Sequence, residues 1–478
     1  MTKHYRQRLV AVIALSFLSF TSPLLLTGNA VAENLSASKA NPEEIASLIE
    51  KLKTNDEREL SAAIKKLGKI GEPAIPALMK ALQDKNLQVR RSAAQVLAKI
   101  GPPAIPDLAQ ALNNPNADVR SSAAYALGGI GAEAITALRQ LVPLLQDSNA
   151  NVRSSAAYAL GRIGAEAITA LPQLVPLLKD SNADVRSRAA EALGGIGAEA
   201  KTALPQLVPL LKDSNADVRS RAALALGGIG AEAQTALPLL VPLLQDPNPD
   251  VRSSAALALG RIGAEAQTAL PQLVSLLQDS NADVRSSAAS ALGSLGAEAQ
   301  TVLPQLVSLL KDSNPGVRSS AAEVFESLGA EAKTVLPQLV SLLKDSNTGV
   351  KTNAANALVS IALSLSEKAN TLTPPELNLA VSNLESALKI MEEPKANFRR
   401  AKIGNLRVSL NFLKAEQRER LFVKSIIRKP YFWGTGIYLF LLFGTFAIRP
   451  LWLLKIYEKL KPIAFKIQFS AQIYLSAT

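Results

Sequence analysis

Apolar residues along most of the chain recur with the spacing of short amphipathic helices. In the stretch from Glu232 to Gly263, leucine and valine follow helical spacing around Pro238, and this pattern stops at Asp246. A second apolar face begins after the turn sequence PNPD. It consists of Val251, Ala255, Ala258, Leu259 and Ile262. The pattern predicts a unit made of a helix, a turn and a second helix.

The same unit recurs along the chain at a nearly constant period. The dipeptide Val-Arg marks it, at a spacing of 30 residues once and then of 33 residues seven times, with Lys351 in the last arginine place. The arginines stand at positions 90, 120, 153, 186, 219, 252, 285 and 318. A fixed period of this size is typical of solenoids. We therefore predict an all-α fold, an α-solenoid (superhelix) of about ten helix pairs over residues 42–365.

Special residues occur where the predicted helix ends require them. Asp250 and its equivalents precede the second helix, where an N-cap carboxylate would accept backbone amides. Gly263 and its equivalents follow the last apolar residue, where we expect a left-handed C-cap. Pro172 suits the start of a first helix, whereas Pro176, four residues later, predicts a bend. Ser308 replaces that second proline in a later unit, so the fold does not depend on it.

The pattern LPxLVxLLxDxxxxVRxxAAxALGxIG resembles HEAT repeats, particularly the bacterial type that includes the phycobilisome-lyase HEAT-like proteins. This resemblance implies a structural polar ladder between turn aspartates and Val-Arg arginines of neighbouring units. By position, the ladder would involve Asp180, Asp213 and Asp246 with Arg186, Arg219 and Arg252. The family also includes hydroxylases that hold iron with His-Glu pairs. No such pair exists in this sequence, so that activity cannot be carried over.

Cysteine is absent from the chain, and the only histidine is His4. The thiolate nucleophile, the imidazole base and the commonest transition-metal ligands are therefore missing together. Aspartate-rich and asparagine-rich turns offer few oxygens to calcium, and a capping role explains them better. We predict a protein that is not an enzyme, with no catalytic residues, no metal and no cofactor.

The net charge of +12 is concentrated at the two ends of the chain. Residues 1–32 carry +3 and residues 394–478 carry +13, which leaves −4 for residues 33–393. A folded body with that charge gives little support to a nucleic-acid partner. The basic ends fit an export signal and a membrane-proximal tail instead.

The N-terminus has the organisation of a secretory signal. Lys3, Arg6 and Arg8 precede an apolar run, and Ala30-Val31-Ala32 offers a small-x-small cleavage site. We predict a signal peptide over 1–32 followed by a linker over 33–41. The alternative is an uncleaved signal anchor, and either interpretation exports the residues that follow.

An uncharged segment near the other end predicts a transmembrane helix over 431–448. Arg428-Lys429 and Arg449 bound it, and Tyr431 and Trp433 suit a membrane interface. We expect a single-pass membrane protein with the solenoid in the periplasm or an equivalent lumen, and a short basic cytoplasmic tail over 449–478. This layout resembles cyanobacterial membrane proteins in which an exported HEAT array precedes a cytoplasmic NTPase module.

Heptad-like spacing of apolar residues follows Pro374-Pro375. It includes Leu377, Val381, Leu384 and Leu388 before Pro394, and Ile403, Leu406, Leu410 and Leu413 after it. The spacing predicts a helical hairpin or a short coiled coil over 374–428.

The candidate partner surface follows from columns that vary between otherwise similar units. Counted from the Val-Arg arginine, the variation is clearest at +2, +5 and +9, which share one helical face. In HEAT stacks the second helices line the concave side. The candidate partner-binding residues are Tyr125, Tyr158, Arg188, Arg221, Leu224, Leu257 and Arg261. The alternative is that an exposed face has drifted after duplication.

These observations favour a membrane-anchored scaffold that binds a protein or peptide ligand along its concave face, with membrane lipid around the C-terminal helix. One alternative is the ectodomain of a membrane sensor that signals to a cytoplasmic NTPase or effector. The resemblance leaves another open, a phycobilisome-lyase-like binder of chromophore or phycobiliprotein. The sequence does not identify the ligand or the oligomeric state.

Overall fold

The computed structural model describes residues 41–295, 302–394 and 398–427, and every regular element in these ranges is an α-helix or a 3-10 helix. The prediction of an all-helical solenoid is therefore confirmed. The predicted signal peptide over 1–32 and the predicted membrane helix over 431–448 lie outside the described residues. The chain divides into two compact units, one ending at Val324 and the other beginning at Phe325.

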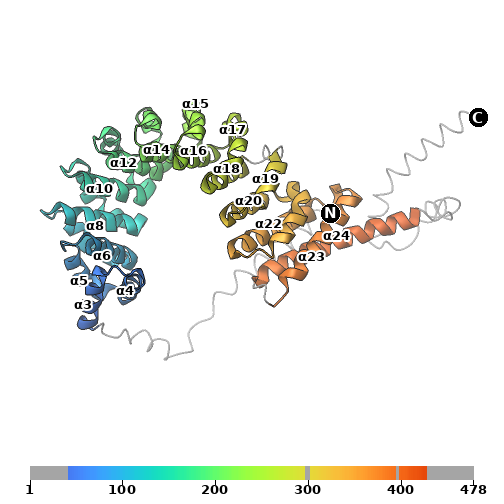
Figure 1. The fold of residues 1–478 in the computed structure, drawn as a ribbon, viewed down its shortest axis with the longest axis horizontal. Helices are drawn as coiled ribbons and strands as arrows, with labels where there is room; N and C mark the ends of the chain where they lie inside the picture. Colours follow the sequence, from blue (N-terminus) through green and yellow to red (C-terminus); the bar gives the residue numbers. More distant parts are fainter. Residues whose placement is uncertain (1–40, 296–301, 395–397, 428–478) are drawn as a thin grey trace, which may run out of the picture. The chain divides into compact units, whose positions relative to one another are not determined.

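The first unit is a row of helix pairs, with the long second helices side by side (Figure 1). The figure shows α16 and α18 on the inner side of this row and α15 and α17 on its outer side. The α-helices are α3 (Pro42–Glu50), α4 (Glu57–Ile70), α5 (Ile75–Ala81), α6 (Leu87–Ile100), α7 (Ile105–Ala111), α8 (Ala117–Ile130), α9 (Leu138–Leu141), α10 (Ala150–Ile163), α11 (Leu171–Leu174), α12 (Ala183–Ile196), α13 (Leu204–Leu207), α14 (Ala216–Ile229), α15 (Leu237–Leu240), α16 (Pro249–Ile262), α17 (Leu270–Ser275), α18 (Ala282–Ser294) and α19 (Leu303–Leu309).

Short 3-10 segments connect these helices. They are η1 (Lys51–Lys53), η2 (Glu72–Ala74), η3 (Pro102–Ala104), η4 (Gly131–Ala137), η5 (Val142–Gln146), η6 (Gly164–Ala170), η7 (Val175–Lys179), η8 (Gly197–Ala203), η9 (Val208–Lys212), η10 (Gly230–Ala236), η11 (Val241–Gln245), η12 (Ala264–Ala269) and η13 (Leu276–Gln278). The boundary between the two units falls inside α20 (Pro315–Leu328).

The second helices are capped by asparagine, and the prediction of aspartate N-caps was wrong by two positions. Asn248 has an extended backbone, and its side-chain Oδ1 accepts hydrogen bonds from the amides of Asp250 (2.8 Å) and Val251 (3.4 Å). Asp250 itself lies in the first turn, where its negative charge suits the helix dipole. Asn116, Asn182, Asn215 and Asn281 cap α8, α12, α14 and α18 in the same way.

The glycine that ends each second helix has a positive φ, as predicted, but not the left-handed helical conformation. Gly263 has φ 88° and ψ −145°, a region that is essentially restricted to glycine. Its amide donates to the carbonyl of Leu259 at 3.2 Å, which closes the last helical turn. Residues with a side chain are therefore strained at this corner, where the chain leaves the second helix.

Proline decides how regular the first helix of a unit is, as the sequence predicts. With Pro172 and Pro176 present, α11 lasts only from Leu171 to Leu174 and continues as the 3-10 segment η7. With serine in the second place, α19 runs without interruption from Leu303 to Leu309, and the Ser308 hydroxyl donates to the carbonyl of Gln305 at 2.6 Å.

Glycine also lets consecutive second helices approach until their backbones are nearly in contact. A Cβ added to Gly194 on α12 would lie 2.7 Å from the Cα of Ala225 on α14, closer than such atoms pack. Gly161, Gly227 and Gly260 face alanines of the following helix at the same 2.7 Å. The pitch of the row is thus set by a glycine on one helix and an alanine on the next.

The second unit continues with α21 and α22 and ends in two helices that pack against each other. Its elements are η15 (Gly329–Val335), α21 (Leu336–Leu342), α22 (Thr348–Glu367), η16 (Ala369–Thr371), α23 (Pro374–Met391) and α24 (Arg400–Ile427). Thr373 and Glu376 form a capping box at the start of α23. Hydrogen bonds from the backbone amide of Thr373 and from Lys333 lower the pKa of Glu376 to about 2.

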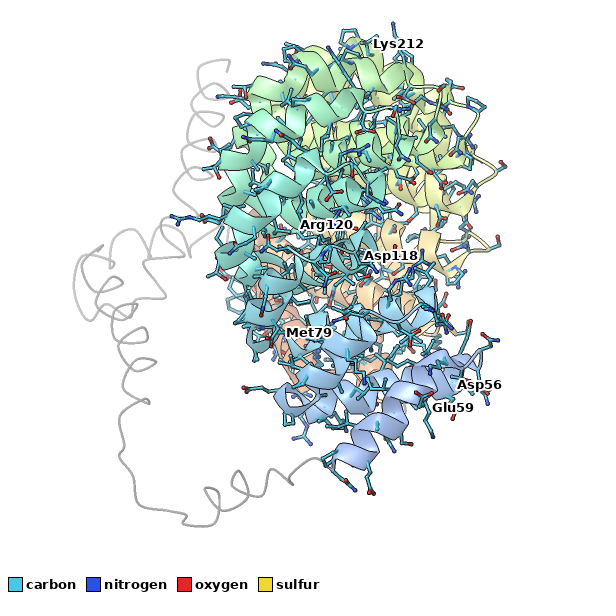
Figure 2. All side chains as sticks on the ribbon, turned by 90° about the vertical axis from the view of Figure 1, so that its left-hand side faces the viewer. Asp56, Glu59, Met79, Asp118, Arg120 and Lys212 are labelled. Carbon is cyan, nitrogen blue, oxygen red and sulfur yellow. The ribbon has the colours of Figure 1, made fainter. Side chains whose placement is uncertain are left out.

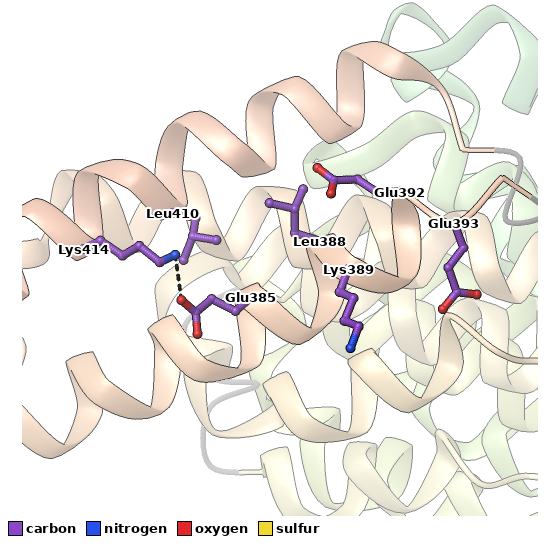
Figure 3. Close-up of a pocket in the computed structure, with 7 residues that line it drawn as sticks. All are labelled: Glu385, Leu388, Lys389, Glu392, Glu393, Leu410 and Lys414. Carbon is purple, nitrogen blue, oxygen red and sulfur yellow. Dashed lines mark ion pairs between the residues drawn. The ribbon is translucent and has the colours of Figure 1, made fainter.

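Buried leucines hold α23 and α24 together. Leu384 faces Leu410 and Leu413 in this core, all of them almost fully buried. A shallow groove of about 410 Å³ lies between the two helices, and the ion pair between Lys414 and Glu385 (2.6 Å) spans it (Figure 3). The predicted hairpin segment thus contains two antiparallel helices.

We expect Gly194→Ala to lower the stability of the solenoid by about 1–3 kcal/mol, because its Cβ would meet the α14 backbone. Gly404 in α24 is a matched helical glycine with no heavy atom within 4 Å of an added Cβ. Gly404→Ala should therefore be neutral or stabilising by about 0.5–1 kcal/mol. Urea unfolding followed by far-UV circular dichroism measures both, and equal effects would contradict the close-packing argument.

Candidate interaction surface

The seven predicted partner-binding residues all lie on second helices of the first unit, on the face that is not packed against the first helices. Tyr125 is 45% exposed and Arg261 is exposed. Tyr158, Arg188, Arg221, Leu224 and Leu257 are half-buried. We call the positions at +2, +5 and +9 of α4 to α18 the inner stripe.

Two tyrosines of adjacent units stack on each other within the inner stripe. The ring centroids of Tyr125 on α8 and Tyr158 on α10 are 5.2 Å apart, with 19° between the ring planes. A Cβ on Gly128 would lie 2.6 Å from the Tyr158 ring, so glycine at that position provides the room for the stack. The guanidinium carbon of Arg188 lies 5.0 Å from the centre of the Tyr158 ring, a cation–π distance.

Charged residues continue this row onto α12 and α14. Arg188 donates to the Glu191 carboxylate at 2.7 Å, and the guanidinium of Arg221 lies 3.8 Å from the same carboxylate. Tyr125, Tyr158, Arg188, Glu191 and Arg221 therefore form one contiguous row across four helices, which we call the tyrosine–arginine row. Glu191 was not among the predicted residues, although it occupies the +5 position of its unit.

The predicted residues beyond this row have a simpler environment. Leu224 and Leu257 are half-buried at the +5 positions of α14 and α16. The Cδ atom of Arg261 lies 3.4 Å from where a Cβ on Gly227 would be, so the stem of Arg261 extends back over α14. This part of the inner stripe is apolar with a cation at its edge.

Part of the variation in the +9 column has a packing cause. A Cβ on Gly195 would collide with the backbone carbonyl of Gly161, and one on Gly228 with that of Gly194. Glycine at these two positions is required by the spacing of the helices rather than left by drift. The same column carries Arg162 and Arg261 in other units.

A groove between α4 and α6 extends the inner stripe toward the N-terminal end of the unit. It has a volume of about 330 Å³. Its lining consists of Glu57, Leu60, Ser61, Ile64, Lys65, Gln95 and Lys99. Gln95 and Lys99 stand at +5 and +9 from Arg90, so the offsets that located the other residues could have found this groove.

The polar ladder implied by the family resemblance is present, and each arginine pairs with the aspartate of the next unit. Arg186 donates through Nε and a terminal nitrogen to the two carboxylate oxygens of Asp213, at 2.9 and 3.0 Å. Its other terminal nitrogen donates to the carbonyl of Asp180 at 2.9 Å. The same pairing joins Arg120–Asp147, Arg153–Asp180, Arg219–Asp246, Arg252–Asp279 and Arg285–Asp312.

The ladder changes at its N-terminal end, where the turn residue is Asn114 instead of aspartate. Arg90 pairs there with Asp118 in the first turn of α8, at 3.0 Å. Figure 2 labels Asp118 beside Arg120, which begins the regular series. Because these guanidiniums are engaged on two sides and mostly buried, they are structural and not ligand sites.

Burial raises the pKa of the Asp213 carboxyl, but hydrogen bonds from Arg186 and from the backbone amide of Asn215 outweigh it. The net pKa therefore lies below the ordinary value of an aspartate. The pKa values of Asp180, Asp246, Asp279 and Asp312 are lowered by the same contacts. The folded ladder thus favours the charged carboxylates.

Other kinds of site were sought in the part of the chain that the structure describes. It contains no cluster of three or more acidic or histidine side chains able to hold a metal ion. One stretch there, Ala216–Gln245, has the length and apolarity of a membrane span. It forms α14, η10, α15 and η11 within the row of repeats, and Gly230 interrupts it at φ 76°.

Comparison with known proteins identifies the repeat. The family model described as "HEAT repeats" matches eight overlapping segments that together run from residue 45 to residue 374. The chain belongs to the HEAT-repeat family. No curated protein matches the sequence of this HEAT protein.

Solved structures share the solenoid fold. The karyopherin Kap121p bound to the SUMO protease Ulp1p is 17% identical with a TM-score of 0.54, over 86% of this HEAT chain and 51% of the karyopherin. Kap121p bound to the extreme C-terminus of the protein phosphatase Cdc14p is 16% identical with a TM-score of 0.53, over 82% and 52%. An engineered protein is 24% identical with a TM-score of 0.43, over 78% and 99%. The HEAT chain spans about half the length of these karyopherins.

Acid should weaken the HEAT solenoid through its ladder. Because the folded pKa values of these carboxyls are lowered, their contribution to stability is complete above the unfolded value of about 4 and is lost as the pH falls further. Asp213→Asn should cost about 1–3 kcal/mol at neutral pH by leaving Arg186 with one partner fewer. The difference between variant and wild type in urea unfolding should shrink below pH 4, and a pH-independent difference would contradict the charge-based explanation.

Proposed function

We propose that this HEAT protein is a membrane-anchored scaffold outside the cytoplasm that binds a protein or peptide along its inner stripe. The observation that carries the proposal is the tyrosine–arginine row, a contiguous and partly exposed surface contributed by four helices. The karyopherin Kap121p, which shares the solenoid fold, is bound to parts of other proteins in its structures. That likeness supports a protein ligand for this chain as well.

The contacts within the row suit it to binding. Tyr158 is held between the Tyr125 ring and the Arg188 guanidinium, so its side chain has little rotamer freedom left to lose. Tyrosine and arginine are the residue types that interfaces use as anchors. The proposal does not include catalysis, because the chain has no cysteine and no histidine apart from His4.

The membrane anchor is proposed from the sequence of the C-terminal region. Residues 431–448 carry no charge and follow Arg428-Lys429. The last described helix, α24, ends at Ile427, immediately before these basic residues. With an export signal over 1–32, the solenoid would lie in the periplasm or an equivalent lumen and the C-terminus in the cytoplasm.

Replacing both tyrosines, Tyr125→Ala with Tyr158→Ala, should weaken capture of the partner about tenfold or more, as expected for anchor residues. The loss of one stacked pair should change stability only by about 1 kcal/mol. Proximity labelling in intact membranes identifies the partner, and co-purification with wild type and variant measures the loss.

Leu259→Ala is the matched control, because Leu259 lies on the buried face of α16. It should cost about 2–5 kcal/mol of local stability without selective loss of the partner. Normal capture by the double tyrosine variant would move the contact surface elsewhere. The next candidate is α24, where Val408, Phe412 and Phe422 are exposed.

The topology can be tested in spheroplasts. External protease should digest the solenoid, while an epitope tag added after Thr478 should survive until the membrane is permeabilised. The physical reason is that a single uncharged span after an export signal leaves the two sides of residues 431–448 in different compartments. A protected solenoid would contradict the proposed location, and a tag digested with the solenoid would contradict the single span.

A further inference from the structure

Basic residues dominate the inner stripe, although residues 33–393 as a whole carry a net charge of −4. On α4 to α18 the stripe has 24 positions, because the 30-residue spacing places Leu60 where later units have the arginine. Glu191 is the one carboxylate among these positions. The cations are Lys65, Lys69, Lys99, Arg162, Arg188, Arg221 and Arg261.

Acidic residues border this strip of cations from α8 onward. On one side they stand in the first turn of the second helices, as Asp118, Asp184, Asp217, Asp250 and Asp283, all exposed. On the other side they follow the glycine caps, as Glu133, Glu166, Glu199, Glu232 and Glu265, also exposed. Between +2 and +9 a helix rises about 10 Å, so the basic strip is about as wide as one extended chain.

The first two second helices lack the aspartate border. Arg58 and Gln88 occupy the positions that correspond to Asp118 on α8. The groove between α4 and α6 therefore presents Lys65 and Lys99 above an apolar floor of Leu60 and Ile64, with Glu57 at one end. This is the part of the stripe where a carboxylate and an apolar side chain of a ligand would both find partners.

We propose that the ligand of the inner stripe is an acidic, extended segment of another protein, in which carboxylates alternate with aromatic or aliphatic side chains. The proposal rests on the protein-binding function proposed above and specifies its ligand. Carboxylates meet the lysines and arginines of the strip, while apolar side chains contact the Tyr125 and Tyr158 rings, Leu224 and Leu257. Helices packed about 9 Å apart give roughly 55 Å from α4 to α16, the length of about 16 extended residues.

The acidic borders decide between an extended segment and other anionic ligands. A globular acidic surface or a nucleic-acid backbone is wider than the strip and would bring negative charge within a Debye length, about 8 Å, of both carboxylate rows. An extended peptide lies between the rows and keeps its carboxylates over the cations. Nucleic acid is therefore the disfavoured occupant and serves as an outcome of the test.

Selection from a phage library of random 16-residue peptides against the full-length protein in detergent tests this ligand. Peptides that need the tyrosines, judged by loss of binding to Tyr125→Ala with Tyr158→Ala, should carry a negative net charge. Their affinity should fall about tenfold for Lys65→Glu with Lys99→Glu, and it should fall as salt is raised. The matched control is Lys80→Glu with Lys85→Glu, which reverses two exposed charges on α5 and the following turn and should leave affinity unchanged.

Each outcome separates the two proposals. Tyrosine-dependent peptides that are neutral or basic would overturn the acidic ligand and leave the binding function in place. A selection without tyrosine-dependent peptides would overturn both. Binding of a 16-nucleotide single-stranded DNA that is stronger than that of the selected peptides, and equally sensitive to Lys65→Glu with Lys99→Glu, would replace the peptide ligand by nucleic acid.

Discussion

The close approach of consecutive second helices is the constraint on which the rest of this solenoid depends. Gly194 leaves the α12 backbone against Ala225 of α14, and the same pairing recurs along the row. Because no side chain separates the helices there, equivalent positions of adjacent units are near enough for their side chains to touch. The stack of Tyr125 on Tyr158 is a direct result, since Gly128 leaves the space that the second ring fills.

Close approach alone would let one helix slide or rotate against the next, and the arginine–aspartate ladder restricts this. Arg186 holds the turn of its own unit through the carbonyl of Asp180 and the turn of the following unit through both oxygens of Asp213. The bidentate geometry fixes direction as well as distance. Glycine therefore sets the pitch, the ladder sets the register, and the inner stripe presents its side chains in the order that both dictate.

The sequence predicted the features that recur at the period of 33 residues and missed those that depend on the conformation of one turn. The helix pairs, the proline-shortened first helices and the ladder all follow from spacing and residue type. The N-cap was assigned to Asp250 instead of Asn248 because both side chains accept amide hydrogen bonds, and only backbone angles distinguish Ncap from the first turn. Contact between neighbouring stripe residues, such as Glu191 with Arg188 and Arg221, depends on a pitch that a one-dimensional pattern does not contain.

The ladder also makes the length of this protein a modular quantity. Each arginine binds the aspartate found 27 residues later, in the next unit, so every internal junction has the same chemistry. Excision or duplication of one 33-residue unit would join an arginine to an aspartate in the same geometry as before. Unequal recombination between such similar coding segments can therefore shorten or lengthen the array while preserving both of its ends. The reach of the inner stripe can then evolve in whole steps, without a new interface having to arise at each one.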